Sequence, residues 1–547
     1  FTFDTGNWEE FNNSAHDYAS WTFRKAPKFF DVVSGLTSDG SGNLPQFNHN
    51  LGSTPGCVIM KATDSGSNWV VFHKGLSASG ANQYIQLNNT NAATSATGFG
   101  IATDTTFEVG AGSALVPSVT YVAYLFAHNN SDGTFGPTGD QDIIKCGSYT
   151  GNGSDTGPVI DLGFEPQWLL VKRASGGTGE WALIDSMRGF TAAGSDAVLK
   201  ADATDAEGNQ LWVSPNATGF KLRATSSAVN ASGSTYIYMA IRRGPLTPPE
   251  AGTEVFSVNT GTPGFTTGFA TDFSIHTTRA GGYSHNAISR LTGLGYLRPD
   301  ATDAEATANS TKWFNNGSAN TLLDLSTNWF AGVSDVISWN WKRAPSYFDA
   351  VAYTGNSTAG LTVSHNLGVA PEMMWVKNRT TGGTFYDWAV YHKDLGNTKY
   401  LFLNTTDAAA ANNEYWNDTS PTSSVFSLGG PSTRTNESGK NYIAYLFATL
   451  AGVSKVGSVS HVQYTDTNVD CGFTSGARFV LLKRTNTTGD WWVFDTTRGI
   501  AAGDDQILFL NSTAAEFAND SMSPLASGFT MVGAGNETGD YIFYAIA

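Results

Sequence analysis

The sequence predicts an all-β protein, a tandem array of β-sandwich domains of jelly-roll or lectin-like type with almost no helix. The 547 residues are several times the usual domain length of about 100 to 150 residues, so several domains must share the chain. Charged residues make up only 14% and glycines number 60, a composition that suits short strands joined by turns. The third observation is an internal repeat, which also sets the domain boundaries.

The repeat appears when the sequence is compared with itself. Residues 20–31 (SWTFRKAPKFFD) recur as residues 338–349 (SWNWKRAPSYFD). Three further runs return in the same way: 121–127 (YVAYLFA) at 442–448, 181–189 (WALIDSMRG) at 491–499, and 202–207 (DATDAE) at 300–305. The order indicates three domain types in rotation.

The linkers between the copies divide the chain into six segments. These are residues 1–25, the C-terminal remnant of a truncated repeat; 26–129, repeat 1; 140–245, repeat 2; 250–343, repeat 3; 344–450, repeat 4, a copy of repeat 1; and 453–547, repeat 5, a copy of repeat 2. We expect a β-sandwich with its own core in each repeat. The remnant predicts that the printed chain is the C-terminal part of a longer array, or that residues before Phe1 were removed.

Strand signals are strongest at the two ends of a repeat. The apolar run 57–60 (CVIM) predicts a buried strand. In the closing run 121–127, Tyr121, Ala123 and Leu125 alternate with side chains that are also apolar. Because both faces are apolar, we expect the closing strand in the interior of a sheet.

Composition also limits the partners. The net charge of −16 would repel nucleic-acid phosphates, so we expect no nucleic-acid partner. No apolar stretch approaches the roughly 20 residues of a membrane helix, so we expect no membrane insertion. The three cysteines fall in different repeats, which excludes a recurring disulfide. This pattern fits synthesis in a reducing cytoplasm, or domains large enough to need no disulfide.

Residues 162–173 (LGFEPQWLLVKR), followed by Trp181 and the Asp-x-x-Arg-Gly turn, carry a family resemblance. The pattern resembles an uncharacterised tandem-repeat domain of marine bacteriophage virion proteins, and the sandwich resembles laminin-G and concanavalin-type folds. The resemblance implies a tail-fibre, head-fibre or similar protein that is made in the host cytoplasm and placed on the virion surface, with a homotrimer as the expected oligomer. Repeat 3 departs from the pattern, with His285 and Ser289 where other repeats have Trp and Asp.

Two Asp-x-x-Arg turns are candidate ligand-binding sites. Asp185 with Arg188, and Asp495 with Arg498, have the spacing of a local surface ion pair or turn cap. Alternatively, each carboxylate and guanidinium holds a sugar hydroxyl or carboxylate in a bidentate manner. The position of Asp185 and Asp495 is taken by histidines in the first domain type, His73 and His392. A general base could not be exchanged so freely, so we interpret these histidines as polar residues at a strand edge.

Further candidates are acidic and aromatic. Two runs place carboxylates at short spacing, as calcium loops do, and their residues are Asp202, Asp205, Glu207, Asp300, Asp303 and Glu305. The alternative is a solvated loop without metal, since the spacing is not that of an EF-hand. Most tryptophans fall in apolar strands, but Trp313 and Trp416 lie in polar surroundings and are candidate platforms for stacking sugars.

The sequence therefore predicts a structural virion protein without catalytic residues or a required cofactor. Its expected partners are other virion proteins and a host surface polysaccharide, bound through many weak contacts. A capsid decoration or assembly protein without a ligand is the first alternative. A polysaccharide depolymerase is the second, and it would need two carboxylates about 5 to 10 Å apart in a cleft.

Overall fold

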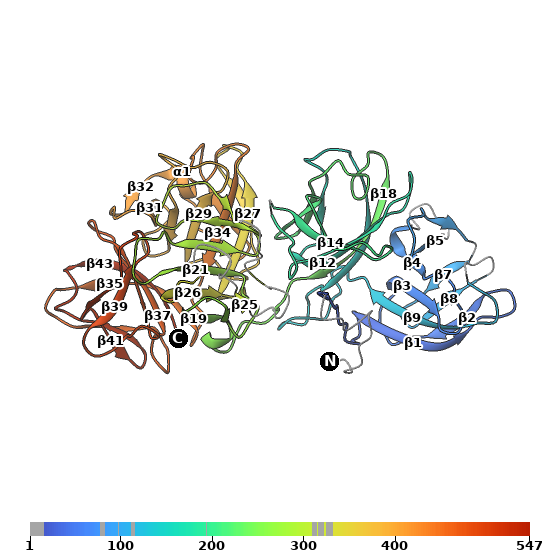
Figure 1. The fold of residues 1–547 in the computed structure, drawn as a ribbon, viewed down its shortest axis with the longest axis horizontal. Coiled ribbons are helices and arrows are strands. Elements are labelled where there is room, and N and C mark those ends of the chain that lie inside the picture. The colour runs from blue at the N-terminus through green and yellow to red at the C-terminus, as the bar shows by residue number, and fades with distance from the viewer. Residues whose placement is uncertain are drawn as a thin grey trace.

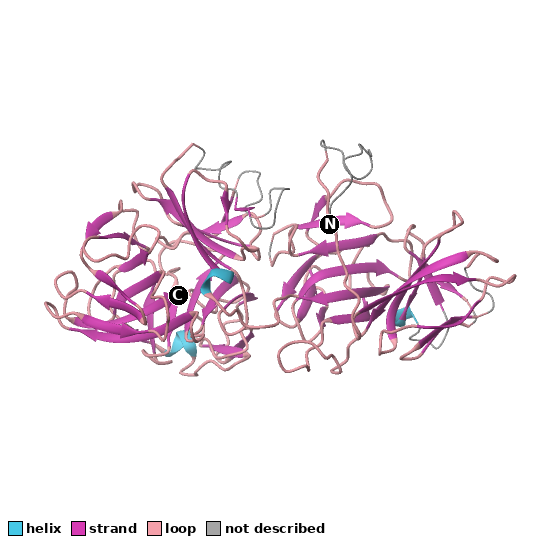
Figure 2. Ribbon diagram, turned by 90° about the horizontal axis from the view of Figure 1, so that it is seen from below, coloured by secondary structure: helices cyan, strands magenta, loops and turns pink. Residues whose placement is uncertain are grey.

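The computed structural model describes residues 16–76, 83–96, 98–110, 115–192, 194–308, 314, 322–323 and 332–547. Almost every element in it is a strand (Figure 2). The helices of this described part are α1 (Asn413–Trp416) and two 3-10 helices, η1 (Lys74–Leu76) and η2 (Gly252–Glu254). The all-β prediction is confirmed. None of the described helices is long and apolar enough to cross a membrane.

The strands fall into five groups. Repeat 1 contains β1 (Phe30–Thr37), β2 (Leu44–Asn48), β3 (Pro55–Ala62), β4 (Val70–His73), β5 (Gln83–Gln86), β6 (Thr94–Ser95), β7 (Phe99–Ala102), β8 (Thr106–Val109) and β9 (Thr120–Ala127). Repeat 2 contains β10 (Ile144–Thr150), β11 (Val159–Asp161), β12 (Pro166–Arg173), β13 (Trp181–Asp185), β14 (Asp196–Lys200), β15 (Gly208–Gln210), β16 (Val213–Asn216), β17 (Gly219–Leu222) and β18 (Thr235–Arg242). Repeat 3 contains β19 (Phe256–Gly261), β20 (Phe265–Thr266), β21 (Phe273–Thr278), β22 (Asn286–Ser289), β23 (Gly295–Leu297), β24 (Ala306–Thr307), β25 (Leu322–Leu323) and β26 (Val336–Trp341). Repeat 4 contains β27 (Phe348–Thr354), β28 (Leu361–Ser364), β29 (Met373–Asn378), β30 (Ala389–His392), β31 (Lys399–Phe402), β32 (Ala410–Ala411), β33 (Val425–Leu428) and β34 (Asn441–Phe447). Repeat 5 contains β35 (Ser454–His461), β36 (Thr467–Asp470), β37 (Phe479–Arg484), β38 (Trp491–Asp495), β39 (Asp505–Phe509), β40 (Phe517–Asn519), β41 (Met522–Leu525), β42 (Gly528–Met531) and β43 (Gly539–Ile546).

Every repeat has the same topology. Its large sheet has six strands, in the order β1-β9-β3-β4-β5-β6 in repeat 1 and β27-β34-β29-β30-β31-β32 in repeat 4. A smaller sheet of two or three strands, such as β2-β8-β7, completes the sandwich. In each large sheet the closing strand lies between the first and third strands, so the expected interior position of the run 121–127 is confirmed.

One face of each large sheet packs on the small sheet of its own repeat. In repeat 4, Val376, Ala444 and Leu446 point to this side and meet Phe426 of β33. Equivalent sandwich cores occur in repeats 2, 3 and 5. The core that we expected for each of these repeats is therefore present.

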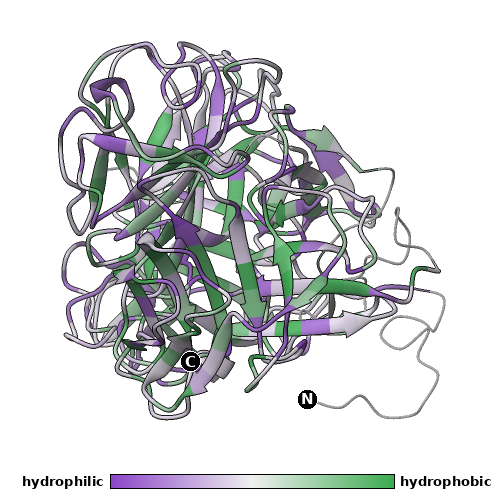
Figure 3. Ribbon diagram, turned by 90° about the vertical axis from the view of Figure 1, so that its left-hand side faces the viewer, coloured by the Kyte–Doolittle hydropathy of each residue, from purple (hydrophilic) through white to green (hydrophobic). Residues whose placement is uncertain are grey.

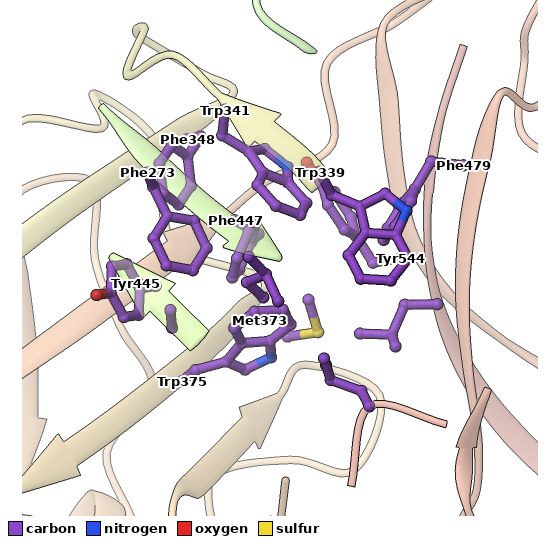
Figure 4. Packing of buried hydrophobic residues seen from close by; sticks show 14 of the residues in the cluster. Phe273, Trp339, Trp341, Phe348, Met373, Trp375, Tyr445, Phe447, Phe479 and Tyr544 are labelled. Carbon is purple, nitrogen blue, oxygen red and sulfur yellow. The ribbon is translucent and has the colours of Figure 1, made fainter. Parts of the chain in front are cut away.

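The other face explains why both sides of the closing strand are apolar. Repeats 3, 4 and 5 form the C-terminal half, residues 255–547, and the outer faces of their large sheets share a second core. Figure 4 shows this core. The ring centroids of Phe273 in β21 and Tyr445 in β34 are 4.1 Å apart, and those of Trp341 in β26 and Phe479 in β37 are 5.7 Å apart. The hydrophobic strands gather inside a more polar rim of loops (Figure 3). The sequence predicted separate cores and gave no indication of this shared one.

Repeats 1 and 2 form the N-terminal half, and their large sheets also meet in one core. The two halves lie side by side (Figure 1). Arg343 crosses the junction between them, because its guanidinium is 2.8 Å from Glu165 of repeat 2 and 2.7 Å from Asp349 of repeat 4. The halves are therefore joined by a buried charge network in addition to the covalent linker.

Candidate functional site

The Asp495 and Arg498 turn lies at the end of β38. The backbone N–H of Arg498 donates to Asp495 Oδ1 at 3.0 Å, which forms the turn, and Arg498 Nε donates to Oδ2 at 2.7 Å. The guanidinium also donates to the Val493 carbonyl oxygen at 2.9 Å and to Glu516 at 3.2 Å. Both side chains of the pair have 0% exposure. The pair is therefore buried, and the expectation of a surface pair was wrong.

A tryptophan from another repeat covers this pair. Trp339 of β26 donates its indole N–H to Asp495 Oδ2 at 3.0 Å, and the Arg498 guanidinium lies 5.5 Å from the ring centroid. A cation held over an indole face is attracted by the ring electrons. The sequence spacing identified the local pair, but the tryptophan lies 156 residues away, and no short-range pattern indicates such a contact.

The N-terminal half repeats this arrangement. Arg188 Nε donates to Asp185 at 2.6 Å, and its guanidinium lies 5.2 Å from the ring of Trp21. Trp21 donates its indole N–H to Asp185 at 3.1 Å, and Arg188 also pairs with Glu207 at 3.0 Å. Both Asp-x-x-Arg turns therefore receive a tryptophan from outside their own repeat. These contacts favour the ion-pair interpretation, while the role in sugar binding stays a prediction.

The acidic run of repeat 2 is divided among different partners. Asp202 accepts the Trp181 backbone N–H at 3.0 Å, Asp205 pairs with Lys200 at 2.8 Å, and Glu207 pairs with Arg188. Residues 203–207 are exposed. The three carboxylates therefore do not converge on a common point.

The run in repeat 3 behaves in the same way. Asp303 pairs with Arg298 at 3.0 Å, and Glu305 accepts two hydrogen bonds from Arg379 of repeat 4, at 2.6 and 2.8 Å. Burial raises the pKa of Asp300. Over the described residues, no group of three or more His, Cys, Asp or Glu side chains could hold a metal ion. Calcium binding by either run therefore has no geometric support in this part of the chain.

These loops instead make a contact between repeats that we call the hairpin–loop contact. A glycine N–H in the hairpin after the third strand of one repeat donates to a threonine carbonyl in the loop after the fifth strand of another. A residue three positions further along that loop donates back to the start of the hairpin. The four copies are Gly179 to Thr90 with Ala93 to Ala174, Gly383 to Thr302 with Glu305 to Arg379, Gly489 to Thr406 with Ala409 to Thr485, and Gly282 to Thr513 with Glu516 to Arg279.

Side chains at equivalent positions of the repeats reinforce the hairpin–loop contact. Lysine ammonium groups donate to the partner loop at 3.0 to 3.1 Å, and these are Lys172 to Asn89, Lys377 to Thr302 and Lys483 to Thr406. Burial lowers the pKa of each of these lysines to about 8. Tryptophan indoles donate to partner carbonyls at 2.8 Å, and these are Trp181 to Gln86, Trp388 to Arg298 and Trp491 to Phe402. The motif residues of the sequence thus hold the repeats together.

The two histidines also lie between repeats. His73 is buried, and its Nε2 is 3.0 Å from the Tyr238 carbonyl oxygen of repeat 2. Burial lowers the pKa of His73 to about 3 and that of the equivalent, fully buried His392 to about 4. We expected these histidines to be polar residues at a strand edge. That expectation was wrong about their exposure, because neighbouring repeats cover both side chains.

The two candidate tryptophan platforms have different outcomes. Trp416, the last residue of α1, is fully buried, donates its indole N–H to the Lys399 carbonyl oxygen at 3.0 Å and packs edge-on against Tyr391. The expectation that Trp416 is exposed was wrong, because the Asn412 side chain caps α1 and the short helix turns the indole into the sandwich. Trp313 lies outside the described residues.

Two cavities have linings suited to a ligand. One of about 540 Å³ lies between repeats 2 and 3, and Arg188, Asn209, Leu294 and Phe314 are among its lining residues. Its only acidic residue among the described lining is Glu305, which pairs with Arg379. A polar and apolar lining of this kind suits a carbohydrate better than it suits acid catalysis.

A second cavity, of about 440 Å³, lies between repeat 1 and the linker that follows it. Its lining includes two carboxylates, Asp104 and Asp132, together with Lys74 and His128. Burial lowers the pKa of His128 to about 4. Two carboxylates in one cavity are the feature that a depolymerase requires.

Comparison with known families agrees with the division into halves. The model of a family described as Domain of unknown function (DUF7483) matches the chain twice, over residues 1–245 and 255–547. The gap between the two matches, residues 246–254, lies in the linker between β18 and β19, where the structure also divides. Searches of curated proteins and of solved structures found no match.

Proposed function

The chain belongs to this family of unknown function, and we propose that it is a structural protein of a phage virion surface, in a fibre or a similar projection. The observation that carries the proposal is the hairpin–loop contact, which recurs four times with the same backbone donors and acceptors. The resemblance of the repeat to phage virion domains supplies the setting.

The chemistry of the contact supports a role in building an array. Each copy uses two backbone hydrogen bonds, which do not depend on side-chain identity, so the repeats can diverge and still dock. The recurring motif residues strengthen the same contact, as the indoles of Trp388 and Trp491 do. The motif lysines and tryptophans, such as Lys377 and Trp388, thus donate to neighbouring repeats. Such a body resists deformation, as a virion projection must.

Adhesion to a host surface polysaccharide is the second part of the proposal. The cavity between repeats 2 and 3 combines the Asn209 amide with apolar Leu294, beside the Arg188 guanidinium, which is held in place by Asp185 and Glu207. Amide groups bind sugar hydroxyls, and apolar side chains cover the faces of sugar rings. An array that repeats such weak contacts on many subunits gains avidity without a tight individual site.

The test compares binding of the purified chain to washed virions and to candidate host cells, scored by quantitative blotting. We expect binding to virions, and binding to cells that a soluble capsular polysaccharide abolishes. The variant Asn209→Ala should weaken cell binding and leave virion binding unchanged. Binding to virions alone would identify an assembly or decoration protein. Binding to neither would overturn the virion proposal.

The cavity of repeat 1 gives the depolymerase alternative its own test. We expect no release of reducing ends when the chain is incubated with host polysaccharide. Release that is lost in both Asp104→Asn and Asp132→Asn would establish the enzyme instead. The matched control is Asp64→Asn, which changes an exposed carboxylate outside the cavity.

A further inference from the structure

The two halves differ in how many hairpin–loop contacts they close. In the C-terminal half repeat 4 docks on repeat 3, repeat 5 docks on repeat 4, and repeat 3 docks on repeat 5, so the contacts form a closed ring of three. In the N-terminal half, repeat 2 docks on repeat 1 through Gly179 and Thr90. Within the described residues, the hairpin at 63–69 of repeat 1 and the loop at 201–207 of repeat 2 make no hairpin–loop contact.

Burial of equivalent aromatic residues shows the same difference. Trp388 and Tyr445 of repeat 4 have 0% exposure, because Phe273 of repeat 3 covers this face of the sheet. The equivalents in repeat 1, Trp69 and Tyr124, are partly exposed. Both pairs of rings keep the same stacking, at 6.3 Å in repeat 4 and 6.4 Å in repeat 1 between centroids. The face of repeat 1 is therefore built like that of repeat 4 but lacks its cover in the described part of the chain.

In the N-terminal half, two side chains make the contacts that one strand of this cover makes in the C-terminal half. Trp21 contacts Asp185 at 3.1 Å, as Trp339 contacts Asp495 at 3.0 Å. Phe23 meets Trp168 edge-on with centroids 6.0 Å apart, as Trp341 meets Phe479 at 5.7 Å. Residues 20–23 thus occupy the place that β26 has in the C-terminal half.

The backbone of this segment lacks the neighbours that its counterpart has. β26 pairs with β19 on one side and with β21 on the other. Residues 20–23 belong to no strand, and no described segment pairs with them. A segment whose side chains are seated and whose backbone pairs with no described strand is a template for further strands.

We propose that the space beside residues 20–23, between the hairpin of repeat 1 and the loop of repeat 2, is the docking site of a domain of the third type. Its strands equivalent to β19 and β21 pair with residues 20–23, and a second ring of three closes. The ring-facing aromatic residue equivalent to Phe273 covers Tyr124.

The charges at the site fit this occupant. Glu516 of repeat 5 accepts from Arg498 of its own repeat and from Arg279 of repeat 3. Glu207 of repeat 2 occupies the position of Glu516 and pairs with Arg188. An arginine equivalent to Arg279 joins it there.

The occupant pairs with the segment at residues 20–23 and is not a second copy of the chain. Repeat 3 of every copy is already held in its own ring, with Phe273 and Trp341 buried. In all five repeats the closing strand is the last strand of its domain, so residues 20–23 take the place of the closing strand in the docked domain.

The experiment places residues 250–335 of this chain in front of residue 18, in place of residues 1–17, and leaves the rest of the chain unchanged. Hydrogen exchange then reports on the backbone at residues 20–24. We expect these amides to exchange about 100-fold or more slowly than in the unmodified chain, as amides in a central strand do. The grafted chain carrying Phe273→Asp in the added copy is the matched control and should keep fast exchange.

A charge reversal tests the mode of docking. Glu207→Arg in the grafted chain should return residues 20–24 to faster exchange, and Arg279→Glu in the added copy should restore the slow exchange. An added domain that folds and leaves residues 20–24 unprotected would overturn the proposal. So would an added domain that stays unfolded, because the same residues fold on equivalent partners in the C-terminal half. Slow exchange at residues 20–24 in an unmodified chain that sediments as a dimer would identify a second copy as the occupant and refute ours.

Discussion

The same motif has different surroundings in the two halves. Lys25 and Arg343 occupy equivalent positions, and each lies beside an aspartate, Asp31 at 3.1 Å and Asp349 at 2.7 Å. The Lys25 side chain is 60% exposed, whereas that of Arg343 is 4% exposed because repeat 2 covers it and adds Glu165. A repeated motif is therefore a surface pair in one copy and the centre of a buried charge network in the other. What covers a motif decides its contribution to stability.

The pKa of Arg343 follows from this burial. Burial by itself lowers the pKa of the guanidinium, but the carboxylates of Asp349 and Glu165 outweigh it and raise the pKa above its usual value. Arg343 therefore stays charged, and removing it leaves the two buried carboxylates with the more distant Arg243, which is 3.7 Å from Glu165 and 3.9 Å from Asp349.

The largest difference between the halves should appear when this cation is removed. We expect Arg343→Ala to lower the free energy of unfolding by about 3 to 5 kcal/mol, because Arg243 is farther from both carboxylates and compensates only part of their buried charge. Lys25→Ala should cost about 0 to 1 kcal/mol, as exposed pairs do. Urea unfolding followed by tryptophan fluorescence measures both. Equal losses would show that the junction between the halves is not closed in solution.

The second comparison uses the equivalent tyrosines of repeats 1 and 4. Tyr445→Ala should cost about 3 kcal/mol or more, because it opens a cavity beneath Phe273 in the shared core. Tyr124→Ala removes a partly exposed ring and should cost about 1 kcal/mol. Addition of a third-type domain to the N-terminal half should bring the two losses together. The same unfolding experiment, repeated on the grafted chain, checks this.

The sequence predicted the elements well because their signals are local. Alternating apolar residues at 121–127 required a strand with two buried faces, and the structure places it inside the sheet. The use of the second face was not predictable, because an apolar side chain looks the same whether it meets its own small sheet or another repeat. The shared core around Phe273 and Tyr445 was missed for this reason.

The predictions for the site residues were wrong where a contact comes from another repeat and where polar residues flank a buried side chain. The spacing of Asp495 and Arg498 indicated their local pair, but Trp339 joins them from another repeat. Trp416 was expected at the surface because Asn412, Asn417 and other polar residues flank it. Asn412 and Asn417 cap the two ends of α1 and are partly exposed, while the helix turns the Trp416 indole toward the core. The polar residues that flank Trp416 therefore indicate where the helix ends, and they do not indicate whether the side chain between them is exposed.

The next prediction concerns the dependence of stability on pH, because repeat 3 carries two buried histidines. Burial lowers the pKa of His276 and of His285 to about 3, against 6.5 for an ordinary histidine. Between those two pH values the unfolded chain binds more protons than the folded chain, so stability falls as the pH falls below about 6.5. At pH 5 each histidine should cost the folded state about 2 kcal/mol.

Two variants test this acid sensitivity. We expect His285→Gln and His276→Gln each to reduce the loss of stability between pH 7 and pH 5 by about 2 kcal/mol. The exposed His16 gives the control, and His16→Gln should leave the loss unchanged. Urea unfolding at the two pH values measures the difference. An undiminished loss in both variants would assign the acid sensitivity to other groups.

The smallest expected effect concerns calcium and the two acidic loops. The loop of repeat 3 is engaged by Arg379, whereas residues 203–207 of repeat 2 are exposed, so any calcium site would lie in the N-terminal half. Asp205 and Glu207 pair with different cations, and we expect millimolar calcium to shift the melting temperature by less than about 1 °C, since ligand that does not bind the folded state cannot stabilise it. Differential scanning calorimetry with calcium and with a chelator measures the shift. A rise of several degrees that Asp205→Asn abolishes would restore the metal site to the loop of repeat 2, and the docking of a third-type domain on that loop would then compete with the ion.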